Sequence, residues 1–168
     1  MIRRFALASA LFVAVGSAAP SMAVADSNTS DLQISASVPN SCTISAGALN
    51  FGAYNPASVT SATGTVTTNC TRGAGAVITL DQGVYSAAGS SSGAPLRRLQ
   101  NGTSSDSLNY TLYQNSGKTT IWGNSTATGV TVTGTGSDQS TSVYGVIPAG
   151  QNVSAGSYID YVAATVTY

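Results

Sequence analysis

From residue 26 onward, short runs of β-branched and aromatic residues recur between clusters of Gly, Pro, Asn and Ser, and helical periodicity is hard to find. Runs of this length and spacing are typical of a β-sandwich or barrel, in which each strand buries one face. The sequence therefore predicts an all-β fold. Strands are expected at residues 42–51, 63–70, 76–80, 108–114, 119–122, 130–134, 142–147 and 158–168.

The first 25 residues have the pattern of a secretory signal peptide. Arg3 and Arg4 precede an apolar run at residues 5–19, and the small residues Ala23-Val24-Ala25 precede Asp26. The apolar run is shorter than the roughly 20 residues that a membrane-spanning helix needs, and no later segment approaches that length. We therefore expect a signal peptide at residues 1–25, a secreted mature chain and no membrane span.

Two cysteines are present, Cys42 and Cys70, so only one pairing is possible. A secreted chain reaches an oxidising compartment, where a disulfide forms and persists. The sequence predicts a Cys42–Cys70 disulfide, with two free buried thiols as the less favoured alternative.

The inventory of charged residues limits the chemistry available to the chain. It contains no histidine and no glutamate, and after the signal peptide four basic residues stand against six aspartates. This balance removes the electrostatic basis for nucleic-acid binding. Catalytic triads and histidine-based metal sites are excluded by composition, so we predict no catalytic, cofactor-binding or metal-binding residue. We expect Arg97 and Arg98 at a solvent-facing strand edge, and Trp122 in the core.

Two segments alternate strictly enough to predict half-buried strands. In residues 31–38 the apolar positions alternate with Gln33, Ser35 and Ser37; these apolar positions are Leu32, Ile34, Ala36 and Val38. At the other end, one face of residues 158–168 carries Tyr158, Val162, Ala164, Val166 and Tyr168. The chain is thus expected to end on a core strand with a free edge, which is an aggregation liability unless another strand covers it.

Several motifs, taken in order, carry a family resemblance. They are LNFGAY at residues 49–54, TTNC at 67–70, LNYTLY at 108–113, IWG at 121–123, YGVIPAGQ at 144–151 and AGSYID at 155–160. With them, residues 42–168 resemble the spore coat protein U domain, the pilin domain of archaic chaperone-usher pili. The chain departs from the family pattern in two places. Val146 stands where arginine is common, and Ala163-Ala164 replaces the usual Thr/Val alternation of the last strand. Because alanine side chains are small, the second departure predicts a shallower groove or a smaller donor residue.

The resemblance implies an incomplete immunoglobulin-like β-sandwich at residues 39–168, which lacks its last strand, preceded by a donor-strand extension at residues 26–38. It implies a pilin, a structural subunit of a surface fimbria that polymerises by donor-strand complementation. Leu32, Ile34, Ala36 and Val38 would enter the groove of the next subunit, beside its last strand. A periplasmic chaperone, an outer-membrane usher and other pilin subunits are the implied partners, and adhesion and biofilm formation the implied roles.

Two alternatives remain open at this point. The sandwich is self-complete and binds carbohydrate through a face around Trp122 or the Ser/Gly-rich loops. Otherwise, the protein belongs to a spore or cell-coat layer.

Overall fold

The computed structural model describes residues 24–168, so the predicted signal peptide lies outside the described residues except for Val24 and Ala25. Residues 24–41 form no helix or strand, and Ser37–Tyr168 form one compact unit. The predicted all-β class is confirmed: the described chain contains strands and one short 3-10 helix, η1 (Thr126–Thr128). Within this described part, no helix is long and apolar enough to cross a membrane.

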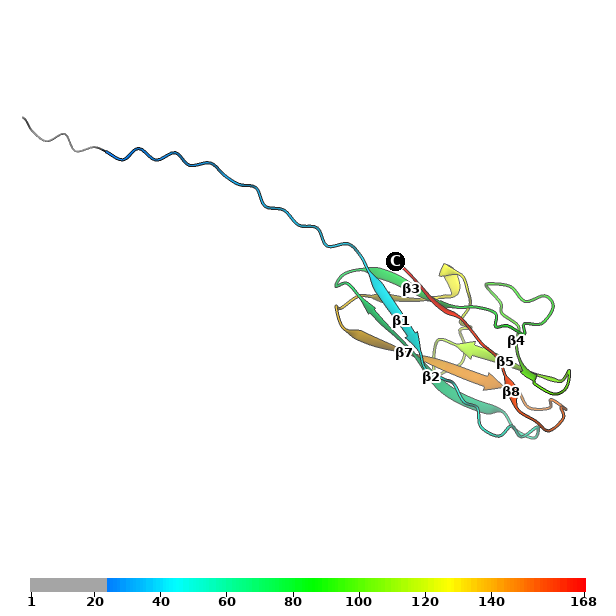
Figure 1. Ribbon diagram of the computed structural model, residues 1–168. Helices are drawn as coiled ribbons and strands as arrows, with labels where there is room; N and C mark the ends of the chain where they lie inside the picture. Colours follow the sequence, from blue (N-terminus) through cyan, green and yellow to red (C-terminus); the bar gives the residue numbers. More distant parts are fainter. Residues whose placement is uncertain (1–23) are drawn as a thin grey trace, which may run out of the picture. The chain divides into compact units, whose positions relative to one another are not determined.

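The strands form two antiparallel sheets (Figure 1). The six-stranded sheet has the order β1-β2-β7-β5-β4-β8, and the three-stranded sheet has the order β6-β3-β9. The strand bounds are β1 Cys42–Ala46, β2 Thr60–Cys70, β3 Gly75–Leu80, β4 Arg97–Asn101, β5 Ser107–Tyr113, β6 Val130–Thr133, β7 Asp138–Ile147, β8 Tyr158–Ile159 and β9 Ala164–Thr167.

The core lies between the two sheets and follows from alternation along the strands. In β2 the side chains of Val66, Thr68 and Cys70 are buried while their neighbours face outward, and β7 repeats the pattern with Val143 and Ile147. The main buried cluster consists of Val66, Ile78, Leu80, Leu108, Tyr110, Leu112, Trp122, Val143 and Ile147. Trp122 is fully buried and its indole Nε1 donates to the Ile78 carbonyl at 2.9 Å, so its predicted core position is confirmed.

The predicted disulfide is confirmed. Cys42 on β1 and Cys70 on β2 are direct cross-strand partners and are bonded to each other. Cys70 is buried against Ala74 and Ala76, in a small second cluster that Val166 also contacts. The bond therefore fixes β1 to the large sheet at one end of the sandwich.

Three strand predictions need correction. The expected strand at residues 158–168 is broken: β8 pairs with β4 in the large sheet, whereas β9 pairs with β3 in the small one. Residues 119–122 form only an isolated bridge, Tyr113 with Ile121, because the Asn115 side chain accepts from the amides of Thr119 and Thr120 and holds a turn. The strand expected at residues 42–51 ends at Ala46, as β1. In addition, β4 was not predicted.

Arg97 on β4 is also corrected, because it is buried with 1% of its surface exposed and does not face solvent. Its guanidinium donates to the backbone carbonyls of Asp81 at 2.7 Å, Leu80 at 2.8 Å and Trp122 at 2.9 Å. Burial lowers the pKa of Arg97, while Tyr110, Asp81 and Asp160 act in the opposite direction. The arginine thus ties the carbonyls at the end of β3 to β4.

Candidate functional site

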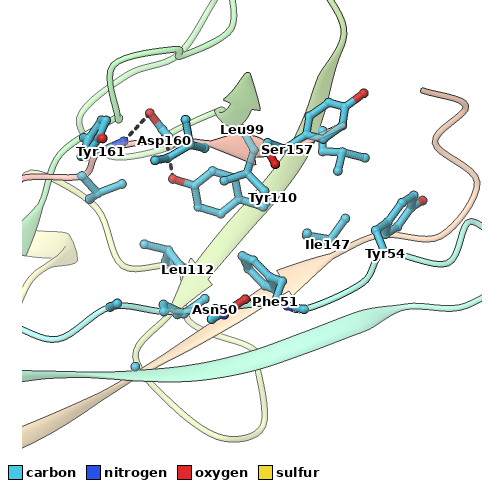
Figure 2. Close-up of a pocket in the computed structure, with 18 of the residues that line it drawn as sticks. Asn50, Phe51, Tyr54, Leu99, Tyr110, Leu112, Ile147, Ser157, Asp160 and Tyr161 are labelled. Atoms are coloured by element: carbon cyan, nitrogen blue, oxygen red, sulfur yellow. Dashed lines mark hydrogen bonds between the residues drawn. The ribbon is translucent and has the colours of Figure 1, made fainter. Parts of the chain in front are cut away.

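An open groove of about 1180 Å³ lies between two segments that are distant in sequence (Figure 2). One wall is formed by residues 46–54, which follow β1, and the other by residues 151–162 and Ala164. The floor is made of core side chains from β2, β5 and β7, among them Val66, Leu112 and Ile147. The groove therefore opens directly onto the hydrophobic core.

The first wall depends on two glycines beneath it. A Cβ on Gly145 would lie 2.7 Å from the Phe51 ring, and one on Gly64 would lie 3.0 Å from the Leu49 Cβ. Because these positions lack side chains, Leu49 and Phe51 can lie down against β2 and β7. Phe51 meets Tyr110 edge-on, with ring centroids 6.0 Å apart and planes at 65°, a favourable aromatic geometry.

The same wall is held at its far end by hydrogen bonds. The Tyr54 hydroxyl donates to the Pro148 carbonyl at 2.9 Å and accepts from the Gln151 amide at 3.0 Å. The Gln151 side chain in turn accepts from the Asn109 N–H at 2.7 Å and donates to the Asn109 carbonyl at 2.9 Å. Pro148 has no N–H to give to β5, so the side chain of Gln151 continues the pairing with Asn109 where β7 ends.

The second wall contains one carboxylate, Asp160. The Tyr110 hydroxyl donates to Asp160 Oδ2 at 2.7 Å, and the Tyr161 amide donates to Oδ1 at 2.9 Å (Figure 2). The Val84 amide also donates to Oδ1 at 2.9 Å. Burial, and then the hydrogen bond to Asp160, raise the pKa of Tyr110 far above its ordinary value. The Asp81 carboxylate accepts the Ala163 amide at 3.0 Å. Together these aspartates hold the crossing between β8 and β9.

Asp160 is not among the groove residues predicted from the sequence. The sequence does carry a signal for it, because Asp160 shares the even-numbered face with Tyr158 and Val162. In the structure all three side chains are half-buried.

Two strand edges border the groove. β1 and β9 each end a sheet, so each has one neighbour within the described chain. The Asp81 amide donates to the Ala163 carbonyl, and the Gly47 amide donates to the Thr65 carbonyl. Since alternate residues of an antiparallel strand point their backbone groups to opposite sides, Ala164 and Val166 of β9 and Ile44 and Ala46 of β1 direct theirs to the open edges.

Three of the five residues predicted to line the groove do so, and two lie elsewhere. Tyr158, Val162 and Ala164 line the groove. Val166 packs instead on the cluster beside the disulfide, and Tyr168 is 56% exposed.

The predicted donor residues form no strand. Leu32, Ile34 and Val38 are 84%, 87% and 82% exposed, and Ala36 is also exposed.

The arrangement suits burial of apolar groups more than reaction chemistry. The one carboxylate that lines the groove is already held by Tyr110 and backbone amides. No group of three or more His, Cys, Asp or Glu side chains that could hold a metal ion occurs among the residues described. Trp122 is buried, so its side chain is not available for the alternative interpretation in which a face around it binds carbohydrate.

The sandwich, its disulfide and the open groove define the class of fold, which is similar to that of a chaperone-usher pilus subunit. A solved chain similar to this one comes from the CsuC-CsuE chaperone-tip adhesion subunit pre-assembly complex of archaic chaperone-usher Csu pili of Acinetobacter baumannii, with a TM-score of 0.55. The two sequences are 20% identical, and the match covers 78% of this chain but only 40% of the solved one. This likeness concerns the fold.

The chain belongs to the Spore Coat Protein U domain family, whose family model matches residues 28–165. It is also similar to Protein U of Myxococcus xanthus, with 42% identity over 171 residues that cover 95% of this chain and 96% of that protein. The resemblance inferred from the sequence motifs is therefore confirmed.

Proposed function

We propose that this protein is a structural, non-catalytic subunit of a surface pilus and that it polymerises by donor-strand complementation. The observation that carries the proposal is the groove, in which partly buried apolar side chains such as Leu49, Phe51 and Val162 lie over the core between two open strand edges. Residues 26–38 supply a segment of matching chemistry, because Leu32, Ile34, Ala36 and Val38 alternate with polar residues. In this proposal the segment of one copy fills the groove of the next.

The energy for this exchange comes from two sources. An inserted strand gains main-chain hydrogen bonds along an exposed edge and buries alternate side chains in pockets. Leu32, Ile34 and Val38 are more than four-fifths exposed, and burying each contributes about 1.5 to 3 kcal/mol. Ala36 adds less, because its side chain is smaller.

The geometry of such an assembly is head to tail. The donor segment and the acceptor groove are different surfaces, so the contact is heterologous and propagates as an open fibre without closing into a ring. Before assembly the exposed groove needs cover. We propose a periplasmic chaperone for this role and an outer-membrane usher for export. The finished fibre would stand on the cell surface, where adhesion and biofilm formation are its proposed roles.

The test uses matched substitutions in the donor segment. Ile34→Asp places a charge on the inserted face, whereas Ser35→Asp places the same charge on the outward face. We expect wild type and Ser35→Asp to give ladders of oligomers on denaturing gels that collapse on heating. Ile34→Asp and a deletion of residues 26–38 should give monomer only.

Two outcomes would contradict the proposal. Ladders of unchanged length from the deletion variant would exclude residues 26–38 as the polymerising segment. A stable, non-assembling monomer of the complete mature chain, obtained without any chaperone, would favour a self-complete sandwich.

The family description favours a second destination, a spore or cell-coat layer. The same strand exchange could build either structure, so the location of the polymer separates the two. Immunogold labelling of thin fibres that extend from the cell supports the pilus, whereas labelling confined to a continuous coat supports the layer.

A further inference from the structure

The outward face of the large sheet carries a regular array of hydroxyl groups. Cross-strand pairing aligns Ser45 with Thr67 and Ser140 in one row, and Thr65 with Ser142 in the next. The Oγ atoms of Thr67 and Ser140 lie 3.5 Å apart. Neighbouring strands lie about 4.8 Å apart, and successive outward residues on one strand about 6.6 Å apart. The face therefore presents hydroxyls at a repeating spacing.

A pair of tyrosines continues this array. Tyr113 on β5 is the direct cross-strand partner of Tyr144 on β7, and Tyr144 is the partner of Thr63 on β2. Both rings are half-exposed and belong to the outward set, since Leu112, Val143 and Gly145 beside them are buried. Half-exposed aromatic rings beside polar groups offer an apolar surface with a polar edge.

The charge of the face narrows the choice of partner. On the outward side of β1, β2, β7 and β5, the only ionisable group apart from the two tyrosines is Asp138, at one end, where Asn69 Nδ2 donates to it at 2.9 Å. At the opposite end Lys118 Nζ donates to Ser61 Oγ at 2.7 Å. Between these ends the surface is neutral. Two cations lie at the margin of this surface, Lys118 and, on the adjacent β4, Arg98, whose guanidinium already donates to the carbonyls of Tyr85 and Ser86. Two marginal cations are few for a polyanion such as nucleic acid, and a strongly charged protein surface finds little complementary charge.

We propose that this face binds a neutral polysaccharide. The Tyr113–Tyr144 pair stacks against the apolar faces of the sugar rings, and the hydroxyl rows, with Thr65 at their centre, exchange hydrogen bonds with the sugar hydroxyls. A repeating surface fits a repeating polymer better than it fits a globular partner. The inference goes beyond the proposed pilus function, because the groove lies mainly against the inner face of the same sheet. Among the residues named for this array, Thr65 alone also lines the groove, and the two tyrosines do not.

The experiment measures depletion of the full mature chain from solution by three insoluble neutral polysaccharides, namely cellulose, chitin and cross-linked dextran, with insoluble pectate as the anionic control. We expect the wild type to be retained on at least one neutral polymer and not on pectate. Replacing both tyrosines, Tyr113→Ser with Tyr144→Ser, should weaken retention about tenfold or more, because two stacking contacts are lost. The double phenylalanine variant keeps the rings and should bind within about threefold of wild type.

A second pair of variants distinguishes a loss of polysaccharide binding from a loss of folding. Thr65→Lys puts a long charged side chain at the centre of the array, at an exposed position. Thr131→Lys makes the same change at an exposed position of β6, on the other sheet. Thr65→Lys should lose retention while Thr131→Lys keeps it, and both should melt at the wild-type temperature.

Three results would overturn the inference. The first is absence of wild-type retention on all three neutral polymers, and the second is equal retention of wild type and Thr65→Lys. The third is a decrease in sedimentation of the protein alone on Thr65→Lys substitution, which would make this face a contact between copies of the chain.

Discussion

At the scale of single residues, Arg97 is the most consequential side chain outside the groove. It is 1% exposed, and its guanidinium holds the carbonyls of Leu80, Asp81 and Trp122. Arg97→Met preserves much of the volume but leaves these carbonyls without their donor. We expect a loss of about 3 to 5 kcal/mol in the free energy of unfolding, measured by urea denaturation.

Arg98 is the matched control for that substitution. It is half-buried and donates to only two carbonyls, those of Tyr85 and Ser86, at 3.0 Å each. Arg98→Met should cost about 1 kcal/mol. Equal losses for the two methionine variants would contradict the structural role given to Arg97.

Asp106 makes the stability of the fold sensitive to acid. Its carboxylate accepts hydrogen bonds from the hydroxyl and the amide of Ser154, and these bonds lower the pKa of Asp106 below its ordinary value. A carboxyl group with a depressed folded pKa stabilises the fold above its unfolded pKa, and the contribution is lost as pH falls through the folded pKa.

We therefore expect the urea midpoint of the wild type to fall as the pH drops below about 4. Asp106→Asn should be less stable at pH 7 and should show a smaller decrease on acidification. A wild type and an asparagine variant with parallel pH profiles would show that the Ser154 contacts contribute nothing.

At the scale of elements, the first wall of the groove depends on β7 being able to approach it. Gly145→Ala places a methyl group 2.7 Å from the Phe51 ring, so the ring must shift away from Tyr110. Overpacking of this kind costs about 1 to 3 kcal/mol. Gly75→Ala on β3 is the control because no atom lies within 4 Å of its added Cβ; we expect no loss of unfolding free energy there. Equal effects at both glycines would show that the Phe51 contact is not limiting.

The disulfide anchors an edge element, β1, next to the groove. Cys42 and Cys70 are 28 positions apart in sequence, and closing a loop of that size stabilises the folded state by about 3 to 4 kcal/mol on the chain-entropy estimate. The double variant Cys42→Ala with Cys70→Ala should lose about that much in urea unfolding. An unchanged midpoint would mean that β1 is held by its pairing with β2 alone.

At the scale of the whole molecule, the incomplete sandwich should respond to an added strand. A synthetic peptide of residues 27–38, added to the domain that lacks its own segment, should raise the unfolding free energy by RT ln(1 + [L]/Kd), about 2.7 kcal/mol at a hundred times the Kd. The same peptide with Ile34→Asp should have little effect. Identical thermal shifts with the two peptides would exclude side-chain insertion as the source of the stabilisation.

Much of this molecule could be predicted from the sequence, for a physical reason. Alternation with a period of two shows which side chains of a strand are buried, so the all-β class, the inward set of β2 and the apolar set of residues 31–38 are visible without a structure. Two cysteines allow one pairing. The family motifs supplied the resemblance that the family match confirms.

The tertiary structure alone decided which sheet each strand joins and which polar groups are buried. Alternation does not show that residues 158–168 cross from β4 to β3. That crossing depends on two contacts between residues far apart in sequence: Asp81 accepts the amide of Ala163, and Asp160 accepts the amide of Val84. Nor does it place Arg97 beside the carbonyls of Leu80, Asp81 and Trp122, or Tyr113 beside Tyr144. Such contacts join residues tens of positions apart, and only the folded chain brings them together.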